Sequence, residues 1–230
     1  MYALNAYFVP HFGVNMQKIY IFDLDGTLVD SMELAVDMVL SLLDEYHIPY
    51  ERSIVKILTP LGFKGIAKYY SEELGVPLTP EEIYAIFTER LGDLYAGKVA
   101  LKAGVKETLA QLKSQGVRMN VLTASPHIFT DVCLKNNGVF DWFENVWSAE
   151  DFGALKSDIR IYREAAKRLG VVVSNCVMVD DSYHVLQVAK SAGMKTVGVY
   201  EPFSADAVED IKNTADGYAE NFLDILQMEI

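Results

Sequence analysis

The chain has 230 residues, of which 51% are hydrophobic and 23% charged, a composition typical of a globular protein rather than a disordered one. Its formal net charge of -12 argues against a general surface for nucleic acid or for anionic membranes, because such surfaces need clustered lysine and arginine. No apolar run reaches the roughly 18 residues that span a bilayer, so we expect no membrane partner.

Two further features bear on the compartment in which the protein works. Cys133 and Cys176 lie far apart in apolar stretches, which argues against a disulfide framework or a thiolate metal site and favours a reducing, cytoplasmic location. Residues 1–17 are apolar and aromatic, with no lysine or arginine before Lys18, so they do not resemble a secretory signal. We interpret them as an N-terminal extension whose role the sequence leaves open, and Met16 as a natural start.

The segment KIYIFDL, residues 18–24, predicts a strand buried on both sides in a parallel sheet, because its apolar side chains are nearly continuous. Four helices without an intervening strand are expected after it, separated by stretches rich in proline and glycine: Met32–Tyr46, Arg52–Leu58, Lys64–Leu74 and Pro80–Tyr95. We interpret residues 31–97 as an all-helical insertion.

From residue 98 onward the pattern alternates between helices and strands. Helices are expected over 105–116, 127–138, 157–170 and 184–193, and strands over 117–123, 145–149, 175–181 and 195–200. This alternation is typical of right-handed crossovers that build a parallel sheet. The sequence therefore predicts an α/β fold, with a Rossmann-like, doubly wound parallel sheet core over 18–30 and 98–230 and an inserted α-helical cap domain over 31–97.

Acidic residues cluster at the expected ends of two strands. Asp23 and Asp25 follow the first strand, Asp180 and Asp181 follow VMV, and Thr123 ends the strand between them in sequence. In open α/β sheets ligands bind beyond the carboxyl ends of the strands, so these side chains are expected to share one crevice. Four carboxylates at such short distances repel one another, and a hard divalent cation such as Mg²⁺ offsets their negative charge.

Lys156, in the loop before the helix expected over 157–170, is expected to return to the same edge and to neutralise charge on the substrate. Each of these residues also has an ordinary interpretation. Asp180 and Asp181 alone could form a turn or a helix N-cap, and Thr123 and Lys156 alone could be a strand end and a solvated loop lysine. An EF-hand loop is disfavoured, because such a loop has its glycine at position six, whereas Gly26 is at position four when Asp23 is counted as position one. The functional interpretation depends on the order and combination of the residues.

The combination resembles the haloacid dehalogenase-like hydrolase superfamily. DLDGTLVDS is similar to its first motif, Thr123 in VLTAS to the second, Lys156 to the third, and VMVDDSYHVLQVAKSAGM to the fourth. A helical insertion directly after the first motif resembles the C1-capped branch of phosphoglycolate phosphatases and β-phosphoglucomutases. Together the motifs cover roughly residues 18–222, and their shared order makes the resemblance specific.

The resemblance implies a Mg²⁺-dependent phosphatase that works through an aspartyl-phosphate. Asp23 is implied as the nucleophile and Asp25 as the general acid and base. The Mg²⁺ is expected on the Asp23 side chain, the Asp25 backbone carbonyl and Asp181, with Asp180 binding directly or through water. Its expected role is to shield the nucleophile from the negative phosphoryl group.

The phosphoryl oxygens are expected to be held by Thr123, by Lys156 and by the backbone N–H groups of Ala124 and Ser125 at the start of a helix. The expected partner is a small phosphorylated sugar, organic acid or nucleotide, with no nucleic acid or membrane, and the sequence leaves the oligomeric state open.

Alternatives remain. A β-phosphoglucomutase-like phosphosugar mutase would use the same intermediate, but mutases of this branch carry a histidine where this chain has Ala35. A non-catalytic phospho-acceptor or binding relative is the other alternative. Substrate choice is expected to depend on the cap, at Phe63 and Lys64 in the LTPLGFKG segment. The aromatic residues at helical spacing are interpreted as the core of the cap: Tyr69, Tyr70, Tyr84, Phe87 and Tyr95.

Overall fold

The computed structural model describes residues 18–230, and the predicted N-terminal extension lies outside this range. Its centre is a parallel six-stranded sheet in the order β3-β2-β1-β4-β5-β6. The strands are β1 (Ile19–Phe22), β2 (Arg118–Thr123), β3 (Asn145–Ser148), β4 (Cys176–Asp180), β5 (Lys195–Val199) and β6 (Gly217–Ala219). The predicted α/β class and parallel sheet are confirmed. The sequence analysis missed β6, whose three residues are too few for a recognisable pattern.

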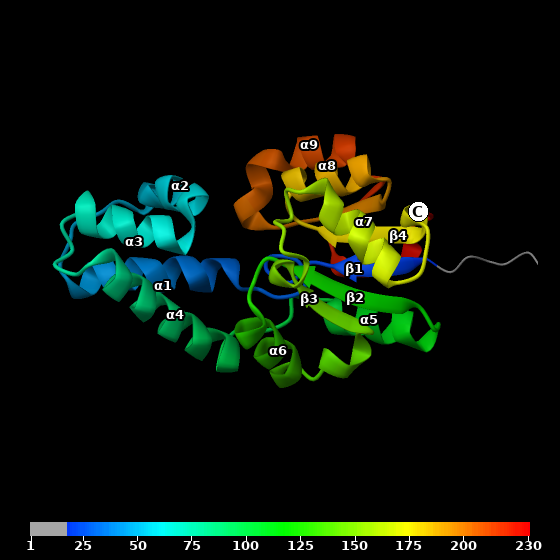
Figure 1. Ribbon diagram of the computed structural model, residues 1–230, viewed down its shortest axis with the longest axis horizontal. Helices are drawn as coiled ribbons and strands as arrows, with labels where there is room; N and C mark the ends of the chain where they lie inside the picture. The colour runs from blue at the N-terminus through cyan, green and yellow to red at the C-terminus, as the bar shows by residue number, and fades with distance from the viewer. Residues whose placement is uncertain (1–17) are drawn as a thin grey trace, which may run out of the picture.

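Helices cover both faces of the sheet, as Figure 1 shows. These are α5 (Val105–Ser114), α6 (His127–Asn136), α7 (Ile159–Arg168), α8 (Tyr183–Ala192) and α9 (Val208–Thr214). Alternate side chains of β1 pack into different clusters, Tyr20 and Phe22 with residues of α5 and α6, and Ile19 and Ile21 with residues of α7 and α8. This two-sided burial explains the continuous apolar run in the sequence. No helix within residues 18–230 is long and apolar enough to cross a membrane.

A separate group of helices forms a lobe beside the sheet (Figure 1). The lobe comprises α1 (Met32–Glu45), α2 (Val55–Leu58), α3 (Gly62–Glu72) and α4 (Pro80–Gly97), and the helix expected over residues 52–58 begins with a 3₁₀ turn at Arg52–Ile54. Helix α4 starts where Thr79 and Glu82 form a capping box. Its other end packs against α6, where the rings of Tyr95 and Phe129 stack with centroids 5.5 Å apart.

The interior of the lobe is aromatic, as expected. Tyr70 and Phe87 are fully buried and their rings meet edge to face, with centroids 5.8 Å apart. The prediction is wrong for Tyr84, which is 38% exposed because it lies on the outer side of α4. Helical spacing alone did not separate it from its buried neighbours.

Strand register brings the ends of β1 and β4 together. Phe22 pairs with Val179, and the Asp23 N–H donates to the Val179 carbonyl at 2.9 Å. One strand further, Asp180 pairs with Gly198 of β5. A Cβ atom at Gly198 would lie 2.2 Å from Cγ2 of Ile211, a buried and branched side chain with little freedom to move. The close packing of α9 on β5 therefore depends on this glycine.

We expect Gly198→Ala to lower the free energy of unfolding by about 1–3 kcal/mol, because the added methyl overpacks the contact with Ile211. Gly97→Ala is the matched control, since no atom of the described part of the chain lies within 4 Å of a Cβ at that helical position. The control should be neutral or stabilising by up to about 1 kcal/mol. Urea unfolding of both variants measures the difference, and equal stability would contradict the packing argument.

Candidate active site

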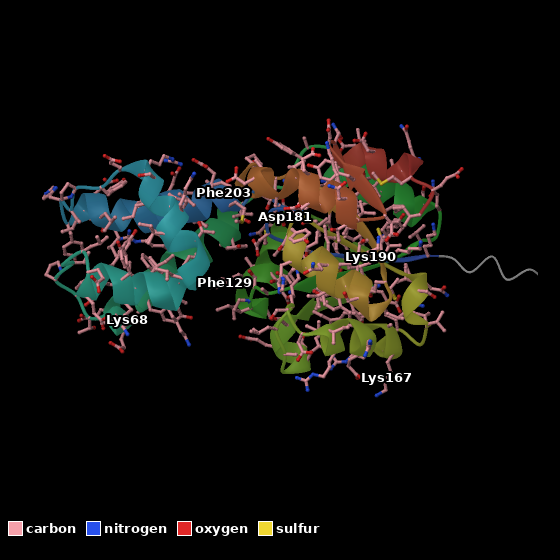
Figure 2. The ribbon with its side chains drawn as sticks, turned by 90° about the horizontal axis from the view of Figure 1, so that it is seen from above. Lys68, Phe129, Lys167, Asp181, Lys190 and Phe203 are labelled. Atoms are coloured by element: carbon pink, nitrogen blue, oxygen red, sulfur yellow. The ribbon has the colours of Figure 1, made fainter. Side chains whose placement is uncertain are left out.

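Three buried carboxylates meet where β1 and β4 end. Asp23 follows β1, Asp180 is the last residue of β4, and Asp181 comes next. One carboxylate oxygen from each lies within 4.8 Å of the others, and all three residues are at most 7% exposed. Figure 2 shows Asp181 near the junction of the lobe with the sheet. The expected convergence of these three acids is thus seen in the structure.

Lys156 supplies the positive charge beside the carboxylates. Its Nζ atom lies 2.6 Å from Asp23 Oδ1 and 2.6 Å from Asp180 Oδ2. The lysine precedes α7 and is 8% exposed, and the hydroxyl of buried Tyr162 donates to its backbone carbonyl at 2.6 Å. Tyr162 therefore fixes the loop that carries the lysine into the acidic cluster.

The cluster holds more negative charge than Lys156 alone balances. Burial raises the pKa of Asp23 and of Asp180 above the ordinary range, and the charge of Lys156 opposes this shift at both. Burial, followed by the charge of Asp23, raises the pKa of Asp181 to about 6, against a hydrogen bond from Ser204. Three buried carboxylates that face Lys156 fit a hard divalent cation, which prefers oxygen ligands.

Asp25, the fourth acid expected in the crevice, is not among these three clustered carboxylates, and three hydroxyl groups bind its side chain. Ser31 Oγ donates to Asp25 Oδ1 at 2.7 Å, the Tyr95 hydroxyl donates to the same oxygen, and Ser125 Oγ donates to Oδ2 at 2.6 Å. The sequence analysis did not find Ser31, which lies inside the first motif, or this role for Tyr95. Tyr95 lies 70 positions from Asp25, so no local pattern could have indicated the contact.

The loop after β2 differs in one detail from the expectation. Thr123 is buried at the end of β2, as predicted, but the Ser125 backbone N–H donates to Thr123 Oγ1 at 3.0 Å and is not directed outward. Helix α6 begins at His127, so Ala124 and Ser125 precede the helix and do not form its first turn. Ser125 reaches the site through its hydroxyl instead.

The loop after β1 is fixed beside β4 by the conformation of Gly26 and by Lys102, a residue that was not among those expected at the site. Gly26 has φ +75°, and a Cβ there would lie 3.0 Å from the Asp181 carboxyl group. Lys102 Nζ donates to the Gly26 carbonyl at 2.7 Å and pairs with Glu201 at 2.7 Å. Only a glycine permits both this backbone conformation and the close approach to Asp181.

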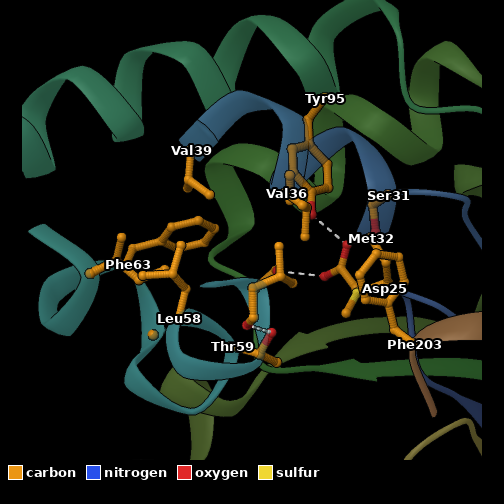
Figure 3. A pocket seen from close by; sticks show the side chains of 15 residues that line it. Asp25, Ser31, Met32, Val36, Val39, Leu58, Thr59, Phe63, Tyr95 and Phe203 are labelled. Carbon is orange, nitrogen blue, oxygen red and sulfur yellow. Dashed lines mark hydrogen bonds between the residues drawn. The ribbon is translucent and has the colours of Figure 1, made fainter. Parts of the chain in front are cut away.

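A cavity of about 250 Å³ opens beside Asp25, between the lobe and the end of the sheet (Figure 3). Phe63 of α3 lines it, as do Ser31, Tyr95 and Ser125. Lys64 does not. It lines a different hollow on the lobe, and its Nζ atom lies 5.6 Å from the centroid of the Tyr84 ring. Of the two cap residues expected near the substrate, the structure therefore brings only Phe63 to Asp25.

Comparison with known proteins identifies related chains. The model of the haloacid dehalogenase-like hydrolase family matches residues 20–199. The chain is 31% identical over 185 residues to pyrophosphatase PpaX of Bacillus velezensis, an alignment covering 78% of this chain and 81% of the relative. It is 30% identical over 209 residues to a phosphoglycolate phosphatase of Caulobacter vibrioides, covering 89% and 87%.

A solved structure agrees with these relationships. CbbY from Rhodobacter sphaeroides, in complex with phosphate, superimposes with a TM-score of 0.74 at 25% sequence identity. The superposition covers 91% of this chain and 96% of that one. The lobe and the sheet thus have their counterparts in one known architecture.

Removal of the lysine charge tests the electrostatics of the cluster. We expect Lys156→Met to lower the free energy of unfolding by about 3 kcal/mol at neutral pH with EDTA present, because two buried carboxylates lose their partner. Lys167→Met is the matched control, since Lys167 is 79% exposed and lies far from the cluster (Figure 2). Its loss should cost less than about 1 kcal/mol. Equal effects in urea unfolding would show that Lys156 does not balance the acids.

Proposed function

Because this chain belongs to the haloacid dehalogenase-like hydrolase family, we propose that it hydrolyses a small phosphate monoester with Mg²⁺ through an aspartyl-phosphate intermediate. It is a phosphohydrolase, and what we add is the cofactor, the intermediate and the residue roles. The observation that supports them is the meeting of Asp23, Asp180 and Asp181 with Lys156 at the ends of β1 and β4, with Asp25 two residues after Asp23 in the chain.

In this proposal Asp23 is the nucleophile. One of its carboxylate oxygens attacks phosphorus, the bond from phosphorus to the leaving oxygen breaks, and Asp25 gives its proton to that oxygen. Asp25 then removes a proton from a water molecule, which attacks the phosphorus of the aspartyl-phosphate and releases phosphate. Splitting the displacement in this way replaces one difficult step with two easier ones.

The remaining residues bind the metal and the phosphoryl group. We assign the metal to the side chains of Asp23, Asp180 and Asp181 and to the Asp25 carbonyl. When bound, Mg²⁺ supplies positive charge that shields the anionic nucleophile from the anionic phosphoryl group. Lys156 and Thr123 are proposed to hold phosphoryl oxygens, with the Ala124 N–H as a further donor.

The hydroxyl groups around Asp25 orient its carboxylate. Ser31 and Ser125 come from the loops after β1 and β2, whereas Tyr95 comes from the last turns of α4. Asp25 is thereby linked to the lobe as well as to the sheet. We propose that residues 31–97 act as a cap that covers the substrate, excludes water and supplies Tyr95 to the acid-base residue.

Phosphate release from p-nitrophenyl phosphate tests the proposed nucleophile. We expect turnover with Mg²⁺, little with excess EDTA, and a loss of about a thousandfold or more in kcat for Asp23→Asn. Asp30→Asn, the same exchange at an exposed position seven residues later, should keep full activity. Full turnover by Asp23→Asn would reject the nucleophile. Stoichiometric labelling without turnover would indicate a phospho-acceptor. In a parallel assay with a hexose phosphate, an isomerised phosphosugar in place of phosphate would indicate a mutase.

The role of Tyr95 is tested by removing its hydroxyl alone. We expect Tyr95→Phe to lower kcat by about tenfold with KM little changed, because a hydrogen bond to the Asp25 carboxylate is lost while the stacked ring remains. Tyr84→Phe, on the exposed side of the same helix, is the control and should behave like the wild type. An unchanged kcat for Tyr95→Phe would show that this contact does not position Asp25.

A further inference from the structure

The cavity beside Asp25 has an apolar wall. Its apolar lining comes from three helices of the lobe and from the segment after β5, and includes Val36, Val39, Leu58, Phe63, Ile66 and Phe203. Figure 3 shows several of these side chains turned toward the space in front of Asp25. Among the described residues that line the cavity, Asp25 is the only charged one.

The hydroxyl groups that line the cavity already donate hydrogen bonds to other groups of the protein. Ser31, Ser125 and Tyr95 each donate to Asp25, and Thr59 Oγ1 donates to the Val55 carbonyl at 2.8 Å. A hydroxyl group has a single proton to donate. An anionic or strongly hydrated group placed here would lose its water without gaining side-chain donors, which is unfavourable.

The lysines around the site are directed elsewhere. Lys156 contacts Asp23 and Asp180 on the side of the phosphoryl group. Lys102 donates to the carbonyls of Gly26 and Tyr200 and pairs with Glu201. Lys64 lies over the Tyr84 ring in another hollow. Within residues 18–230, therefore, no lysine or arginine lines the cavity to bind a second phosphate or a carboxylate.

We infer that the substrates this enzyme prefers are phosphate monoesters of uncharged, predominantly apolar alcohols or phenols, whose leaving group occupies the cavity beside Asp25. The inference rests on the proposed function, because Asp25 must face the leaving oxygen. A volume of about 250 Å³ suits one ring or a short branched chain. Burial of such a group against the lobe contributes favourable free energy in proportion to its apolar area.

Two matched pairs of esters test this inference. Cyclohexylmethyl phosphate and glucose 6-phosphate share a primary ester carbon next to a six-membered ring and differ in hydroxyl groups and the ring oxygen. The phenyl esters 4-methylphenyl phosphate and 4-carboxyphenyl phosphate differ by one charged substituent. We expect kcat/KM to be roughly tenfold or more higher for the apolar member of each pair.

The outcomes separate the two proposals. Release of phosphate with equal or better rates for the polar members overturns the inference and leaves the phosphatase function standing. Release from none of the esters, nor from p-nitrophenyl phosphate, overturns the proposed function and the inference with it. A preference for the apolar member in both pairs supports both.

Variants of Phe63 locate the preference in the cavity. We expect Phe63→Ala to lower kcat/KM for cyclohexylmethyl phosphate by roughly tenfold while methyl phosphate, which does not reach the wall, changes little. Ile57→Ala is the control, because Ile57 is 51% exposed and does not line the cavity.

Phe63→Lys distinguishes recognition from loss of folding. It should improve 4-carboxyphenyl phosphate relative to 4-methylphenyl phosphate, a gain that unfolding cannot produce. Unchanged ester preference in both Phe63 variants would overturn the inference.

Discussion

The arrangement of the whole site depends on three carboxylates packed together out of water. Two neighbouring parallel strands, β1 and β4, end side by side at the point where the chain turns from one half of the sheet to the other, and both end in aspartates. Burial and mutual repulsion make Asp23, Asp180 and Asp181 costly to ionise, and Lys156 offsets only part of that cost. In the proposed function this unbalanced negative charge attracts the dication, which in turn offsets it for an anionic phosphoryl group.

The lobe adds a second environment of opposite character. On one side of Asp25 lie the charged groups to which we assign the metal and the phosphoryl group, and on the other lies the apolar cavity formed largely by the lobe. Asp25 stands at the boundary, and its hydroxyl partners come from both parts of the molecule. A phosphate monoester with an apolar leaving group likewise has a charged end and an apolar end. Its leaving oxygen lies between them, where Asp25 is proposed to donate a proton.

Much of this arrangement was predictable because local signals and topology reinforce each other. A buried strand has a continuous apolar run, and the carboxyl ends of parallel strands share one edge, so Asp23, Asp180 and Asp181 could be placed together without coordinates. Lys156 could be added because the loop that carries it returns to the same edge. These inferences need only the period of the hydrophobic pattern and the direction of the strands. Both follow from the sequence, the second from the alternation of strands with helices.

Contacts set by packing between distant elements were not predictable in the same way. Phe63 and Lys64 are adjacent, yet successive residues of a helix point about 100° apart, so which one faces Asp25 depends on how α3 is rotated against α1. Tyr95 shares its helical spacing with Phe87, but α4 extends past the lobe core, so its last turns meet α6 and Asp25 instead. The lining of the cavity and the contact to Asp25 therefore depend on the rotation and length of two helices, which the hydrophobic pattern constrains only through their buried faces.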